Sequence, residues 1–123
     1  MKLLITTLAL LALHCWLVLS LTAGLHTLPL LSFWLVLPAV VAAGISVFLH
    51  CKYSLKKLFP LAALLVHLLA LLPYAGLVTN QAEGERAVLI LAMVPLYQSL
   101  ALLIVGLIDY VRRREATKRL VAQ

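Results

Sequence analysis

Three long runs of sequence without a charged side chain constrain the fold of this chain more than any other feature. No Asp, Glu, Lys or Arg occurs from Leu3 to Cys51, from Leu58 to Ala82 or from Ala87 to Ile108, which are runs of 49, 25 and 22 residues. Each run exceeds the roughly 20 residues that a helix needs to cross a hydrocarbon core about 30 Å thick. With 65% hydrophobic and 11% charged residues, the chain is also too apolar for a soluble domain. The sequence therefore predicts an all-α integral membrane protein.

The first run is long enough for two spans, because a continuous helix of that length would measure roughly 73 Å. Gly24, His26, Thr27 and Pro29 cluster near its middle and mark the expected turn. We therefore expect one membrane domain, residues 1–123, with four transmembrane helices in an antiparallel bundle and an uncleaved first helix. These helices are expected near residues 3–23, 30–50, 58–79 and 87–111, followed by a basic tail at 112–123.

The basic residues predict the orientation of the spans. Nine of the ten fall on one side of the membrane if both termini lie there, and only Arg86 falls on the other. The positive-inside rule then places both termini in the cytoplasm, and we expect a multi-pass protein of a bacterial inner (plasma) membrane. Nucleic-acid binding is not expected, because no recognition motif accompanies the net charge of +6. The basic residues of the tail are expected to face anionic membrane lipids: Arg112, Arg113, Arg114, Lys118 and Arg119.

Stripes of small residues predict the packing faces, because lipid does not drive helices together and close approach needs small side chains. The second, third and fourth spans each carry such a stripe, and the first carries a less regular one with Ala9, Ala12, Trp16 and Ser20. On the third span, His67 and Tyr74 continue the stripe at helical spacing. The expected packing residues are Ala39, Ala43, Ser46, Ala63, Ala70, Ala92 and Gly106.

Polar residues at matching depths predict a layer near the middle of the membrane. Under the assigned directions, His14 on the first span and His67 on the third lie about 16 and 14 Å from the cytoplasmic edge. Tyr97, Gln98 and Ser99 on the fourth span fall at nearly the same depth. Ionisable groups inside a membrane are unfavourable unless they are paired, so this layer is the candidate site.

Three interpretations of the layer remain open. The histidines are neutral and bond to polar neighbours, or they form a proton or cation path, or they ligate a haem from two facing helices. The interpretation with neutral, hydrogen-bonded histidines is favoured, because no Asp or Glu lies at this depth to take part in a proton or cation path. The nearest acid, Asp109, can pair with Arg112 or Arg113 at i+3 or i+4.

Nothing in the sequence indicates enzyme chemistry, a cofactor or a metal site, and Cys15 and Cys51 are expected to be free thiols. In outline, the size, four spans and basic tail resemble several kinds of small bacterial membrane protein, including immunity proteins, holins, small multidrug transporters and respiratory anchors. The glutamate that such transporters carry in their first helix is absent from residues 3–23. We therefore expect a non-catalytic protein that packs against a membrane partner in an accessory, assembly or immunity-type role. The alternatives are a small homo-oligomeric transporter or channel and, with less support, a haem-binding anchor subunit.

Overall fold

The computed structural model describes residues 1–22, 29–54, 56–79 and 85–123. Its four helices are α1 (Lys2–Thr22), α2 (Pro29–Tyr53), α3 (Leu58–Thr79) and α4 (Glu85–Val121). All four are long and apolar enough to cross a membrane. The predicted all-α class and the four membrane-spanning helices are therefore confirmed, while the turn predicted at Gly24, His26 and Thr27 lies outside the described residues.

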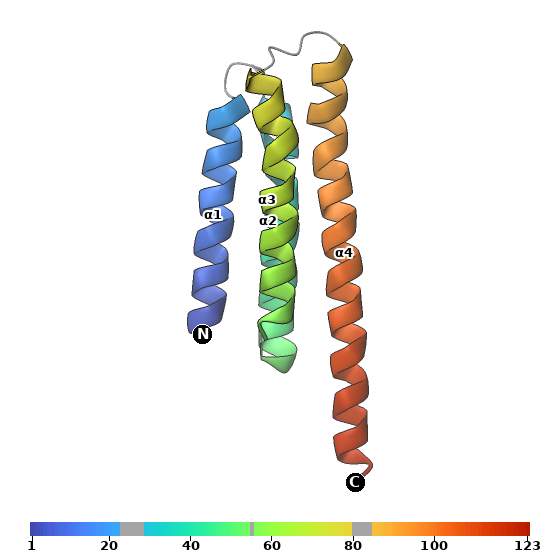
Figure 1. Cartoon of the computed structure of the whole chain (residues 1–123). Helices are drawn as coiled ribbons and strands as arrows, with labels where there is room; N and C mark the ends of the chain where they lie inside the picture. Colours follow the sequence, from blue (N-terminus) through green and yellow to red (C-terminus); the bar gives the residue numbers. More distant parts are fainter. Residues whose placement is uncertain (23–28, 55, 80–84) are drawn as a thin grey trace.

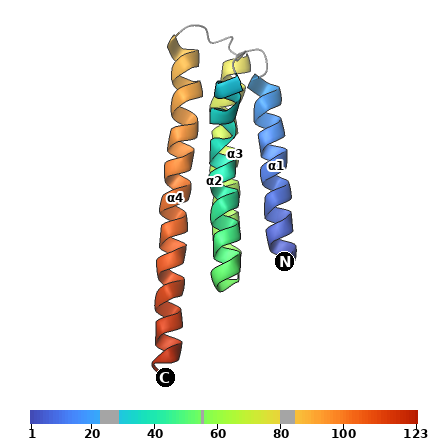
Figure 2. The same ribbon diagram turned by 180° about the vertical axis from the view of Figure 1, so that it is seen from behind.

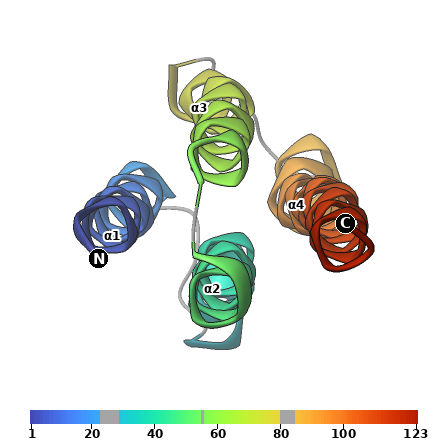
Figure 3. The same cartoon turned by 90° about the horizontal axis from the view of Figure 1, so that it is seen from below.

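The four helices lie side by side at the corners of a diamond. Figure 1 shows both chain termini at the lower end, with α4 projecting beyond the other helices. Seen from behind, α2 lies between α1 and α4 and in front of α3 (Figure 2). The view along the helices places α1 opposite α4 and α2 opposite α3 (Figure 3). The most extensive contacts join α2 with α4, α1 with α2, and α3 with α4, whereas α2 and α3 touch little.

The fourth helix is longer than the sequence predicts. It continues to Val121, through the segment 112–121 that we expected to be a tail. This segment contains Arg, Glu, Ala, Lys and Leu, which favour helices, and it has no Gly or Pro to end one. The ion pair between Asp109 and Arg113, four residues apart, also supports the helix across the predicted boundary.

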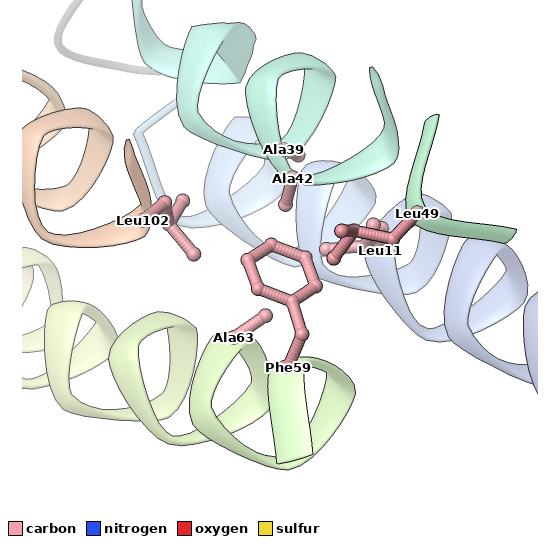
Figure 4. Close-up of a cluster of buried hydrophobic side chains, with 7 residues drawn as sticks. All are labelled: Leu11, Ala39, Ala42, Leu49, Phe59, Ala63 and Leu102. Carbon is pink, nitrogen blue, oxygen red and sulfur yellow. The ribbon is translucent and has the colours of Figure 1, made fainter. Parts of the chain in front are cut away.

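Two clusters of buried apolar side chains form the core. In the cluster nearer the chain termini, Phe59 from the first turn of α3 reaches towards the bundle axis (Figure 4). The small residues Ala39 and Ala42 of α2 leave room for its ring (Figure 4). Leu11, Leu49, Ala63 and Leu102 complete this cluster. The second cluster, towards the other end, contains Val18, Leu35, Tyr74 and Leu91.

Most of the predicted small packing residues lie inside the bundle. Ala39, Ser46, Ala63, Ala70 and Gly106 are buried, and Ala43 is half-buried. A side-chain carbon added at Gly106 would lie 3.0 Å from Ile45 Cγ2 of α2, so the two helices approach closely there. The stripe on α3, which includes His67 and Tyr74, is buried at every position.

Two of the predicted faces need correction. On α4, Ala92 is exposed, because the buried face follows Leu91, Pro95, Gln98 and Leu102, and Ala92 lies about 100° away from Leu91 around the helix. The backbone carbonyl oxygen of Ala92 accepts a hydrogen bond from the indole Nε1 of Trp34 on α2, at 3.1 Å. On α1, the stripe with small residues faces outwards, since all its members are exposed: Ala9, Ala12, Trp16 and Ser20.

Candidate functional site

The predicted polar layer lies between the two apolar clusters. Along α1, His14 falls between Leu11 of one cluster and Val18 of the other. Along α3, His67 falls between Ala63 and Tyr74 in the same way. Gln98 of α4 comes between Leu91 and Leu102, and Pro38 of α2 is the buried residue that follows Leu35. The layer therefore has apolar side chains on both sides along the bundle axis.

The structure brings His14 and His67 into direct contact. Their ring centroids are 4.4 Å apart, and the ring planes are nearly perpendicular at 88°. His67 is 2% exposed and His14 is 9% exposed, so both rings are removed from the surroundings of the bundle. Beside them, an apolar groove of about 140 Å³ opens between α1 and α3.

The hydrogen bond of His67 determines which of its two ring nitrogens carries the hydrogen. Nδ1 lies 2.7 Å from the carbonyl oxygen of Ala63, one turn earlier on α3. Because a carbonyl oxygen only accepts, Nδ1 carries the hydrogen and donates it. In the neutral ring, Nε2 of His67 is then an acceptor, and it is buried without a hydrogen-bond partner among the described residues. The ring thus offers a lone pair to any donor that enters the layer.

Three further buried polar atoms on α3 and α4 have no partner among the described residues. These are the hydroxyl oxygen of Tyr74, Nε2 of Gln98 and Oγ of Ser99. Buried polar groups in proteins normally find a hydrogen-bond partner in protein or in ordered water. Four such atoms on two neighbouring helices are therefore suited to hold water or a small polar ligand. Tyr74 was predicted as a packing residue only, and its hydroxyl group is a further unpartnered polar atom, within the apolar cluster beside the layer.

Tyr97 does not belong to the layer. Its side chain is 67% exposed, and the residues on the inner face of α4 at this level are Pro95 and Gln98. Successive residues of a helix point about 100° apart, so Tyr97, Gln98 and Ser99 cannot all face inwards. Gln98 is buried, Ser99 is half-buried with its hydroxyl oxygen enclosed, and Tyr97 points outwards.

The spacing of the histidines does not fit a haem. Two axial imidazoles lie on opposite faces of a porphyrin, and with iron–nitrogen bonds of about 2 Å their ring centroids would be roughly 6 Å apart. The centroids of His14 and His67 are 4.4 Å apart, with one ring edge towards the other ring. In the part of the chain that the structure describes, no three His, Cys, Asp or Glu side chains are grouped to hold a metal ion.

A second polar cluster ties the projecting helix to the turn between α2 and α3. Arg113 binds Asp109 through two hydrogen bonds, from Nε to Oδ1 at 3.0 Å and from Nη2 to Oδ2 at 2.7 Å. Its Nη1 donates to the carbonyl oxygen of Ser54 at 2.6 Å. Ser54 adopts a left-handed conformation (φ 63°), which ends α2. Arg113 is 7% exposed and is therefore paired inside the protein, contrary to the prediction that it faces lipid.

Next to this cluster, the ammonium group of Lys52 lies among three aromatic rings. It is 5.1 Å from the ring centroid of Tyr110 and 5.7 Å from those of Phe48 and Tyr53. Cations are attracted to the faces of such rings at these distances. Lys52 Nζ also donates to the Tyr110 hydroxyl group at 3.5 Å, so α2 and α4 are linked again here.

Comparison of the chain with protein-family models, with curated proteins and with solved structures finds no match. Of the five basic residues predicted to face lipid, four are exposed: Arg112, Arg114, Lys118 and Arg119.

Proposed function

We propose that this chain is a protein of the bacterial inner membrane that acts without catalysis, by packing laterally against another membrane protein. In this proposal the four helices form an antiparallel bundle with both termini in the cytoplasm. The end that carries both termini also carries the end of α2 and the start of α3 (Figure 1). Lys52 lies in the last turn of α2, and Lys56 and Lys57 immediately precede α3. A reporter that is active only in the periplasm should then stay silent when it is fused after Gln123.

The outward face of α1 is the observation that carries this proposal. Ala9 and Ala12 are exposed, and Trp16 beside them is 64% exposed. Small residues allow the backbone of a second helix to approach closely, which is how helices associate in lipid. α1 turns Leu11 and His14 into the bundle, and no described part of the chain covers this small-residue face. An accessory, assembly or immunity-type role fits a protein whose available surface is such a face.

Photo-crosslinking in cells tests this face. A photoreactive residue in place of Ala12 should give one adduct of defined mass larger than the chain alone, while the same residue at Gly44 should give none. Gly44 is a matched site, because it is exposed on α2 and a side-chain carbon there would meet nothing within 4 Å. The bulky substitution Ala12→Leu should lower recovery of the same partner several-fold, and Gly44→Leu should not. Equal adducts at both sites would reject the proposal, and an adduct of twice the chain mass would indicate self-association instead.

A small homo-oligomeric transporter or channel is the second candidate, and it is favoured by the four buried polar atoms that have no partner in the described part of the chain. His67 Nε2 accepts, Gln98 Nε2 donates, and the hydroxyl groups of Ser99 and Tyr74 do both. With water between them, such groups can pass a proton along a bundle, and histidine titrates near neutral pH. The apolar clusters on both sides of the layer oppose this function, because apolar side chains do not relay a proton.

Glutamine substitutions separate the two candidates. If the layer only stabilises the bundle, His14→Gln and His67→Gln keep a donor and an acceptor and should change the free energy of unfolding by roughly 0–1 kcal/mol. Partner binding should persist in both variants. A proton path would be lost, because an amide does not take up and release a proton near neutral pH. Proton flux into liposomes with wild type, absent in both folded variants, would support the transporter.

A further inference from the structure

A basic groove opens at the end of the bundle that carries the chain termini, between the start of α3 and residues 109–116 of α4. Its volume is about 250 Å³. It is not the polar layer, and the lateral contact proposed for α1 does not involve it. Its walls are formed by Lys56, Leu58, Asp109, Arg112, Arg113 and Ala116.

The charges in this groove do not cancel. Asp109 is the acid in its wall, and both of its carboxylate oxygens already accept from Arg113. Lys56 and Arg112 remain, both exposed and neither in a salt bridge with a described residue. They come from different elements, since Lys56 precedes α3 and Arg112 belongs to α4. The groove thus holds two cationic side chains for a ligand of opposite charge.

The groove lies where the apolar part of two helices ends. α3 begins at Leu58 in the groove wall, and the apolar run of α4 ends with Leu107 and Ile108 immediately before Asp109. Leu58, Leu107 and Ile108 are all exposed. In a membrane, this is the level at which hydrocarbon gives way to lipid phosphates. A bound molecule with one anionic group and one apolar part would satisfy both surfaces.

We propose that this groove binds the headgroup phosphate of an anionic phospholipid. Lys56 and Arg112 contact the phosphate, while Leu58 contacts the first carbons of an acyl chain. Arg113 positions the groove without contacting the lipid, because its three bonds to Asp109 and Ser54 hold the turn against α4. The binding is local, in contrast to the diffuse attraction of the whole tail to a charged membrane surface.

Native mass spectrometry of the full chain from mild detergent tests the groove. The probes are phosphatidylglycerol and phosphatidylcholine with identical acyl chains. We expect wild type to retain one phosphatidylglycerol about tenfold more tightly than phosphatidylcholine, given a favourable contribution from each basic residue. The double variant K56Q/R112Q should lose this preference. The matched control K118Q/R119Q removes the same charge further along α4, away from the groove, and should keep it.

Circular dichroism of both variants first checks that they fold, which is expected because all four side chains are exposed. Equal loss of preference in the two double variants would overturn the proposal, since the tail as a whole would then attract lipid. Wild type without any preference would also overturn it. Inorganic phosphate provides the last arm: if it displaces phosphatidylglycerol at equal concentration, the groove is a site for free phosphate and not for a lipid.

Discussion

Replacing Arg113 by glutamine is expected to lower the free energy of unfolding by about 3 kcal/mol. The variant leaves the carboxylate of Asp109 buried without its ion pair, and removing one partner of a buried pair typically destabilises by about 3–5 kcal/mol. It also removes the hydrogen bond to Ser54 that joins α4 to the turn after α2. Denaturant titration in detergent micelles, followed by circular dichroism, measures the change.

The neighbouring Arg112→Gln is the control, because Arg112 is exposed and its loss should change stability by less than about 0.5 kcal/mol. Asp109→Asn should destabilise about as much as Arg113→Gln. The double variant D109N/R113Q should then be less affected than the sum of the two single variants, since no charge is left unpaired. If R113Q behaved like R112Q, or if the double variant were additive, the buried pair would not hold this end of the bundle.

Gly106→Ile is expected to destabilise the bundle by about 2 kcal/mol. The added side chain would start 3.0 Å from Ile45 Cγ2 and 3.5 Å from Phe59, in a packed contact between α4, α2 and α3. Insertion of bulk into a packed core typically costs about 1–3 kcal/mol. The same titration as above measures the effect.

The control for Gly106 is Gly44→Ile, which adds the same bulk where nothing lies within 4 Å. It should be neutral or slightly stabilising, because isoleucine favours a helix more than glycine does. Trimming the opposing side chain in the double variant G106I/I45A should recover part of the lost stability. Equal stability of the Gly44 and Gly106 variants would show that α2 and α4 do not meet at this glycine.

The helices were predictable because lipid leaves the backbone few alternatives. A segment without charges in a bilayer satisfies its backbone groups by forming a helix, so the charge-free runs determine the spans. The end of α4 was not determined in this way, since Arg112–Val121 is polar and such a segment can be helix or coil. Ion pairing between Asp109 and Arg113 depends on tertiary burial, and the sequence left Arg112 as an equal partner.

The inner faces were predicted best where small and polar residues share one face of a helix. On α3, His67 and Tyr74 share a face with Ala63 and Ala70, and that face is buried. On α1, the small residues Ala9 and Ala12 face outwards, because lipid accepts both alanine and leucine side chains and therefore excludes neither face. The contact of His14 with His67 could be predicted because both residues lie at nearly the same predicted depth in the membrane. The hydrogen bond from Arg113 to Ser54 could not, because its acceptor is a backbone carbonyl oxygen, which every residue has.

The arrangement of the helices has a consequence for the order of assembly during synthesis. α2 and α3 barely touch each other, and each is held mainly by α1 on one side and α4 on the other. When the ribosome has delivered only the first three helices to the membrane, one flank of α2 and one flank of α3 are therefore still open. Arrival of α4 covers both flanks, and Arg113 then binds the turn between α2 and α3 through the carbonyl oxygen of Ser54. We therefore expect membrane chaperones and proteases to act mainly on nascent chains that end before α4.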